Sequence, residues 1–170
     1  MKKALVDCVE NMVKLQFGDA KWQICCNRLG VTTFDELELS KPASVVDIVS
    51  VCAEVIGLDK RNFFAHLGAF WSKDFAPKYF KSWFIMAMSA KEFAKQLDRI
   101  YAILHNPNSN SEKTHIQYNW LDSDTLRLEY QMDADYLELF EALARGIATY
   151  YKPDIRIEKH QNSVTIFHFE

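Results

Sequence analysis

The chain has 170 residues, the size of one ordinary globular domain, and is long enough to bury a substantial core. Twenty basic residues against twenty-three acidic ones give a net charge of -3, with no block of basic residues, which argues against a nucleic-acid partner. No stretch approaches the roughly 18 uncharged apolar residues of a membrane-spanning helix, so we expect a cytoplasmic protein.

The first half of the sequence has the hydrophobic spacing of amphipathic helices, because apolar residues recur three and four positions apart. Gly18 is expected to end the first helix, and Asp19, Ser44 and Asp59 are expected to cap the next three. We predict helices over residues 2–17, 19–30, 45–56 and 62–71, with a polar connection over 32–42.

The next stretch, residues 75–88, is dense in aromatic residues and contains Pro77, which predicts short, broken helical turns that cover the core. Ser89 is followed by Glu92 at the spacing of a capping box. This pattern predicts a long helix that begins at Ser89 and ends near His105, just before a loop rich in asparagine and proline.

The second half alternates polar and apolar residues in short runs typical of strands. The expected order is a strand pair at 115–120 and 125–130, a helix capped by Asp133 or Asp135 that continues to Tyr150, and a second strand pair at 155–158 and 164–169. Segregated helices and a four-stranded antiparallel sheet with one helix across it make an α+β domain. We therefore expect one domain over 1–170, with a helical part (1–106) and a sheet-and-helix part (114–170).

The sequence offers little for catalysis or for a metal centre. It has no glycine-rich phosphate loop, no nucleophile elbow and no HExxH motif, so we expect no enzyme. The cysteines lack the spacing of a zinc site or a disulfide framework, and we expect reduced, buried thiols at Cys8, Cys25, Cys26 and Cys52.

Four groups of residues, taken in order, carry a resemblance to a known family. They are Phe17-Gly18 followed by Trp22; Leu67-Gly68-Ala69-Phe70-Trp71; Phe93, Leu97, Asp98 and Ile100; and Leu128-Glu129-Tyr130 followed by Gly146 and Tyr151. Their order and spacing resemble the haem nitric oxide/oxygen binding (H-NOX) family over nearly the whole chain. The resemblance implies the H-NOX fold, a sensor that binds haem b, and a signalling partner such as a histidine kinase, a cyclase or phosphodiesterase, or a chemotaxis protein.

The chain departs from this family at the positions that hold haem. Tyr101 stands where the resemblance implies the axial histidine. Tyr130-Gln-Met132-Asp-Ala134 stands in place of the family's Tyr-x-Ser-x-Arg, so that only the tyrosine remains. Arginine pairs with a carboxylate through two parallel hydrogen bonds, and alanine has no donor to replace them. The leading hypothesis is a regulatory domain in which haem binding is lost or altered.

Two alternatives stay open. In the first, the protein is a haem-based gas sensor that uses Tyr101 as a phenolate ligand or His105, one helical turn further on. In the second, it is a structural or scaffold subunit without a ligand. The candidate pocket residues are Trp71, Tyr101, His105 and Tyr130, and the aromatic residues from Phe63 to Phe84 either pack as core or line that pocket. His66 is expected to be structural.

Overall fold

The computed structural model describes residues 2–32, 45–96, 116–130, 134–151, 155–160 and 164–169, and every structural statement below concerns these residues. The helices of the first half lie where the hydrophobic spacing predicts them. They are α1 (Lys2–Phe17), α2 (Asp19–Leu29), α4 (Val45–Ile56) and α5 (Lys60–Phe70). Asp59 caps α5 as predicted, because its carboxylate accepts a hydrogen bond of 2.9 Å from the backbone N–H of Asn62.

Two expected caps differ from the structure. Gly18 occupies the capping position of α2, and Asp19, expected to be the cap, is the first helical residue. The carboxylate of Asp19 still lies in the first turn, where the helix dipole favours negative charge. Asp135 cannot cap its helix because α10 (Ala134–Tyr151) begins one residue earlier. The alternative cap Asp133 and the expected cap Ser44 lie outside the described residues.

These four helices enclose the first of two hydrophobic cores, together with the residues that follow α5. Its fully buried residues include Met12, Ile48, Phe63, Phe64 and Leu67, and it also contains all four cysteines. The thiols are free and buried, as predicted. Burial raises the pKa of the Cys8 thiol, and a hydrogen bond with Cys25 together with burial raises the pKa of the Cys52 thiol, so neither is an activated nucleophile at neutral pH.

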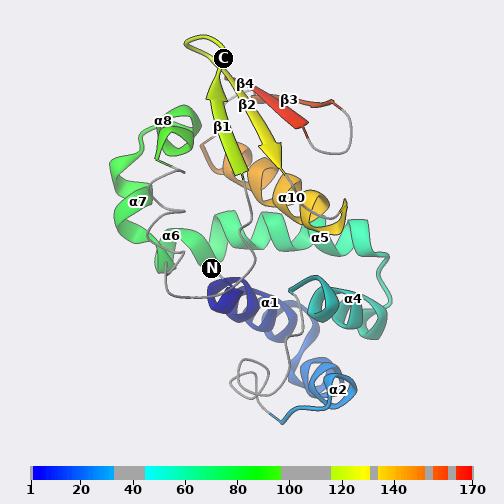
Figure 1. The fold of residues 1–170 in the computed structure, drawn as a ribbon. Helices are drawn as coiled ribbons and strands as arrows, with labels where there is room; N and C mark the ends of the chain where they lie inside the picture. The colour runs from blue at the N-terminus through cyan, green and yellow to red at the C-terminus, as the bar shows by residue number, and fades with distance from the viewer. Residues whose placement is uncertain are drawn as a thin grey trace, which may run out of the picture.

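The aromatic stretch forms short helical pieces, as Pro77 predicts. They are the π-helical turn η1 (Trp71–Phe75), α6 (Ala76–Tyr79) and α7 (Lys81–Met86), followed by α8 (Ala90–Lys95). η1 continues α5 without a break, and a single π-helical turn re-aims the chain that leaves it. In Figure 1, α6, α7 and α8 follow one another along one side of the molecule.

The four strands form one antiparallel sheet, in agreement with the predicted α+β class. They are β1 (Ile116–Trp120), β2 (Thr125–Tyr130), β3 (Ile155–His160) and β4 (Val164–Phe169), and their order in the sheet is β1-β2-β4-β3. Alternate residues of β4 are buried, which gives the sheet one inner face. Leu126, Leu128, Phe167 and Phe169 on that face belong to the second core.

Helix α10 lies between α5 and the sheet, as Figure 1 shows. Leu139 on α10 belongs to the first core, whereas Ile147, two turns later, belongs to the second. Trp71 packs against both cores. The two halves of the chain are therefore joined by one helix and by the residue at which α5 becomes η1.

Gly68 on α5 and Gly146 on α10 allow these two helices to touch through their backbones. A methyl group on Gly68 would overlap the backbone carbonyl of Ala142, and one on Gly146 would overlap the carbonyl of Gly68 and lie 2.9 Å from Ser72 Oγ. Side chains normally keep packed helix axes about 8–10 Å apart, and glycine removes that limit. Both glycines are buried.

No helix among the described residues is long and apolar enough to cross a membrane.

We predict that Gly68→Ala destabilises the fold by about 2 kcal/mol or more, because α5 and α10 must separate to accommodate the methyl group. Chemical denaturation followed by circular dichroism measures the loss. The matched control is Ala65→Ser on the exposed face of the same helix, which should change stability by less than about 0.5 kcal/mol. Equal effects of the two substitutions would contradict the close crossing.

Candidate functional site

Of the four candidate pocket residues, the structure describes the side chain of Trp71. Tyr101 and His105 lie outside the described residues. Tyr130 is the last residue of β2 and pairs with Ile116 at the start of β1; its side chain is not described. Trp71 is described fully and lies half-buried at the start of η1. The site can therefore be built from Trp71 and from the elements that lead to the other three.

Trp71 belongs to a group of aromatic rings centred on Phe84 of α7, which we call the Phe84 cluster. The centroid of the Phe84 ring lies 6.4 Å from that of Trp71 and 5.0 Å from that of Phe93. The Phe84 ring also stacks on Tyr151, with the centroids 6.0 Å apart and an interplanar angle of 7°. Tyr150 packs edge-on against it at 5.0 Å. These separations are those of directly contacting rings, so the cluster packs as core.

Several residues of the aromatic stretch from Phe63 to Phe84 pack in the hydrophobic cores. Phe63, Phe64, Phe70 and Phe84 are buried in one core or the other, as the packing interpretation predicts. Four elements contribute rings to the Phe84 cluster: η1, α7, α8 and α10. The cluster thus joins the helix that leads toward Tyr101 to the helix that follows Tyr130.

Tyr151 brings the polar group of the Phe84 cluster. Its hydroxyl donates a long hydrogen bond of 3.4 Å to the backbone carbonyl of Phe84. Burial, with the nearby Tyr150 and Glu92, raises the pKa of Tyr151 to about 12. The phenol is therefore neutral at physiological pH and acts as a hydrogen-bond donor rather than as an anionic ligand.

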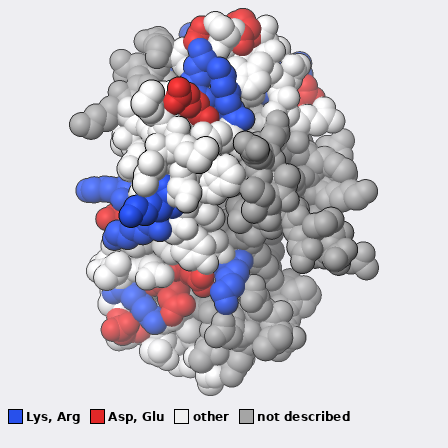
Figure 2. All heavy atoms as spheres, turned by 90° about the vertical axis from the view of Figure 1, so that its left-hand side faces the viewer, with Lys and Arg blue, Asp and Glu red and all other residues white. Residues whose placement is uncertain are grey.

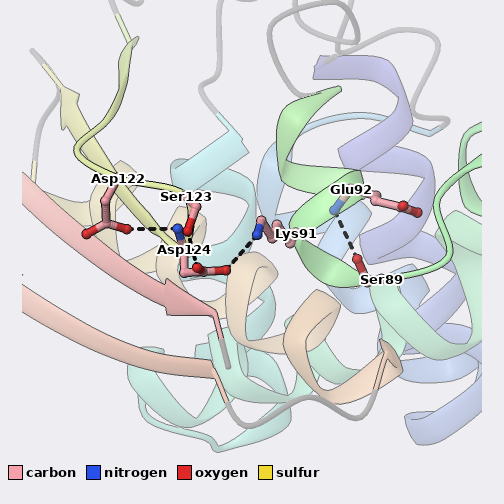
Figure 3. Close-up of polar contacts among 6 residues, drawn as sticks. All are labelled: Ser89, Lys91, Glu92, Asp122, Ser123 and Asp124. Carbon is pink, nitrogen blue, oxygen red and sulfur yellow. Dashed lines mark hydrogen bonds and ion pairs between the residues drawn. The ribbon is translucent and has the colours of Figure 1, made fainter.

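Helix α8 begins as the sequence predicts. Ser89 occupies the capping position, and its hydroxyl accepts a hydrogen bond of 3.2 Å from the backbone N–H of Glu92. The Glu92 carboxylate accepts from the N–H of Met88 at 2.7 Å, one residue before the partner that a capping box would use. Figure 3 shows the Ser89–Glu92 pair at the start of the helix.

The same helix ends earlier than the hydrophobic spacing predicts. The expected helix reaches His105, but α8 stops at Lys95. The N–H of Gln96 bonds to the carbonyl of Phe93, three residues back, at 2.9 Å. This bond tightens the last turn and ends the regular ladder of bonds to the fourth preceding residue. The residues after Gln96 that would carry Tyr101 and His105 lie outside the described residues.

Two lysines attach α8 to the turn between β1 and β2, and we call this contact the α8 clasp. Lys91 Nζ forms an ion pair of 2.6 Å with the carboxylate of Asp124 (Figure 3). Lys95, one helical turn later, places its ammonium group 5.7 Å from the ring centre of Trp120. Both contacts lie on the same face of α8, so the helix is held against the hairpin at two points.

The turn that receives the α8 clasp is itself ordered by hydrogen bonds. The Asp122 carboxylate accepts a bond of 2.8 Å from the N–H of Asp124, and the Ser123 hydroxyl donates to the Asp124 carboxylate (Figure 3). The carbonyl of Asp124 accepts from the N–H of Phe169 on β4 at 2.8 Å. Hydrogen bonds from Lys91 and Ser123 hold the pKa of Asp124 below its ordinary value.

Sequence reasoning missed the α8 clasp because Lys91 and Asp124 are 33 residues apart. The only local signal is the pair Lys91 and Lys95 on a helix whose other face is apolar. Such a pair usually indicates a solvated surface.

The other described side chains with ligand chemistry form no metal site. No group of three or more His, Cys, Asp or Glu side chains among the described residues could hold a metal ion. His66 is exposed on α5 and packs its ring against Phe17 at 6.3 Å, which supports the structural role expected for it. His168 on β4 lies 3.6 Å from Glu158 on the neighbouring strand.

A groove with a volume of about 540 Å³ lies elsewhere, between α1 and the η1–α6 segment. Leu15 on α1 forms part of one wall. Phe75 and Tyr79 form part of the other, and their stacked rings have centroids 5.0 Å apart. Neither Trp71 nor any ring centred on Phe84 lines this groove. Phe70, Phe75 and Tyr79 of the aromatic stretch do line it, so this stretch contributes both to the cores and to a groove at the surface.

Comparisons with known proteins agree with this geometry. A family model described as Haem-NO-binding matches residues 2–159. An oxygen-binding H-NOX domain related to soluble guanylate cyclases, solved as its oxygen complex, aligns with a TM-score of 0.77 at 15% identity, over 100% of this chain and 95% of that chain. An H-NOX protein from S. oneidensis, solved in its Fe(II)NO state, aligns with a TM-score of 0.71 at 17% identity, over 100% and 99%. A comparison with curated protein sequences finds no match.

We predict that Asp124→Asn lowers the melting temperature at neutral pH, because the ion pair with Lys91 is lost. The pKa of Asp124 is lower in the folded protein than in the unfolded chain. Its contribution to the stability of the fold is therefore fully present above the unfolded pKa of about 3.9, and it is lost as the pH falls through the pKa of the folded state. Melting curves of the wild type and the variant should therefore converge on acidification. The effect is small at an exposed site.

A double-mutant cycle provides the control for the α8 clasp. After Lys91→Gln, the further substitution Asp124→Asn should cost less than it does in the wild type, because their shared contact is already gone. Strictly additive melting temperatures would show that the two residues act independently.

Proposed function

We propose a function from the finding that the chain belongs to the haem-NO-binding (H-NOX) family. The protein is a non-catalytic, cytoplasmic regulatory domain. In it, haem binding through the family's residues is lost or altered. Members of this family are sensor domains, and the resemblance implies that a stand-alone member acts on a separate signalling protein. A histidine kinase, a cyclase or phosphodiesterase, or a chemotaxis protein is the proposed partner.

The observation that carries this proposal is the chemistry of the residues at the haem-holding positions. Ala134 is the first residue of α10 and follows Tyr130, the end of β2, after three residues. At this position the resemblance implies an arginine that pairs with a haem propionate. A methyl side chain has no donor, and Asp133 and Asp135 on either side would repel a carboxylate. The donor set therefore does not fit haem held in the family's way.

The axial position supports the same conclusion. Tyr101 replaces the neutral imidazole that suits ferrous haem. A tyrosine ligand would have to be a phenolate, and its ordinary pKa near 10 must fall considerably for that. The nearest cation in sequence, Arg99, is two residues away and would lie on another face of a helix. We therefore propose that Tyr101 fills space as an aromatic residue.

The direct packing of the Phe84 cluster is compatible with this proposal. Trp71, the candidate pocket residue that is described fully, contacts Phe84 ring to ring. A large empty cavity would cost several kcal/mol, so a domain without haem gains stability when side chains fill the space. Met132 in place of the family's serine would add flexible apolar volume.

We predict that protein purified from haem-supplied cells has no stoichiometric Soret band, even after haemin is added, because neither Tyr101 nor Ala134 supplies the family's contact. The visible absorption spectrum measures this directly. A stoichiometric band that disappears in His105→Ala or Tyr101→Phe would overturn the proposal in favour of a haem-based gas sensor. His66→Ala is the matched control, since His66 packs on Phe17 at the surface.

Native mass spectrometry then separates the two remaining versions of the proposal. A bound small molecule would identify a pocket adapted to another ligand. A bare polypeptide mass would favour a filled core and the scaffold alternative.

A further inference from the structure

The end of α7 and its connection to α8 present three neighbouring apolar side chains to solvent, which we call the apolar tip: Ile85, Met86 and Met88. They are 68%, 63% and 85% exposed, respectively. Their exposure is set by the fold, because Phe84 before them and Ala87 between them are buried in the second core. The two buried residues hold the segment against the core, and the three residues of the tip extend into solvent.

Lysines border the apolar tip. The segment from Lys73 to Met88 contains three lysines, Lys73, Lys78 and Lys81, against the acidic residue Asp74, and the Glu92 carboxylate also reaches the tip through its bond to the N–H of Met88. All three lysines are exposed, and this local excess of positive charge contrasts with the net charge of -3 of the whole chain. Figure 2 views the side on which α6, α7 and α8 lie in Figure 1 and shows lysine and arginine side chains, with acidic side chains beside them, above and below uncharged surface.

Aromatic residues of α6, α7 and α10 have the amphipathic character of an interface. Tyr79 is 52% exposed while its ring stacks on Phe75, and Tyr150 is 40% exposed while its ring packs on Phe84. Trp83 on α7 is half-buried. Tyrosine and tryptophan side chains of this kind are favoured where an apolar phase meets water.

The shape of the tip distinguishes among possible occupants. A partner helix would bind a concave groove through its apolar face. The groove between α1 and α6 is lined by other residues, and none of the three residues of the tip contributes to it. A projecting apolar segment bordered by lysines instead complements a bilayer, where apolar side chains enter the interface and ammonium groups meet anionic headgroups.

We propose that the end of α7 and its connection to α8 dock reversibly on an anionic lipid bilayer, with Ile85, Met86 and Met88 in the interface and Lys78 and Lys81 against headgroup phosphates. The binding is peripheral, and no described helix crosses the membrane. This proposal does not depend on whether haem is bound.

The test is co-sedimentation of the full chain with vesicles of phosphatidylcholine that contain about one-third phosphatidylserine, an anionic composition. Binding should be measurable at low salt, weaken as salt is raised, and fall strongly with vesicles of phosphatidylcholine alone. Absence of binding to the anionic vesicles overturns the proposal, and so does equal binding to both compositions.

Variants locate the contact. The double variant Met86→Ser and Met88→Ser should weaken binding at least tenfold, whereas Leu15→Ser, at a residue 74% exposed on α1, should leave binding unchanged. Lys81→Gln should weaken binding on the order of fivefold, and Arg61→Gln at the start of α5 is the matched charge control. Loss of binding in a control variant equal to that in the tip variants overturns the assignment.

Methionine oxidation tests the same surface without substitution. Peroxide should oxidise Met86 and Met88 readily in free protein and leave Met12, which is fully buried, intact. Anionic vesicles should slow oxidation of the two exposed methionines several-fold. If mass spectrometry finds the same oxidation rates with and without vesicles, the tip remains in water and the membrane proposal fails; a protein partner would then be the occupant to seek.

Discussion

The close crossing of α5 and α10 at Gly68 and Gly146 is the constraint on which the rest of the structure depends. Because the two backbones touch, α10 lies deep enough to serve two cores. Leu139 faces the helices of the first half, and Ile147 faces the sheet. A larger residue at either glycine would move α10 outward and separate both cores at once. The two halves of the chain therefore pack as one unit around a contact between two helix backbones.

The π-helical turn η1, which follows α5 directly, lies beside this crossing. Ser72, the second residue of η1, is buried beside Gly146, and its hydroxyl donates to the carbonyl of Ala69 at 3.1 Å. Trp71, one residue earlier, packs against both cores. The widened turn redirects the chain toward α6 and α7, and Phe84 on α7 thereby reaches the rings of α8 and α10. The position of α8 follows from this chain of contacts.

The sequence predicts the helices and strands well because their signals are local. The carboxylate of Asp59 caps α5 in the structure, and the alternating residues of β4 are buried as expected of a strand. The ion pair of Lys91 with Asp124 could not be predicted, since it requires the relative placement of a helix and a hairpin. The hydrophobic spacing also does not predict that α8 ends at Lys95, because the backbone bond from Gln96 to Phe93 does not depend on which residues are apolar. Among the candidate site residues, Trp71 could be placed, whereas Tyr101 and His105 fall outside the described residues.

The residues that hold the described fold together differ from those at which the resemblance implies contacts with haem. The contacts that hold α8 and α10 in place involve Gly68, Gly146, Lys91 and the rings around Phe84. None of these is a position at which the resemblance implies a bond to haem. Under the proposed function, the fold persists with Tyr101 and Ala134 at the positions where the resemblance implies haem-binding residues, since the described contacts that stabilise the domain lie elsewhere. A shared fold shows where a ligand would sit in relatives, and the side chains at that place decide whether this chain binds one.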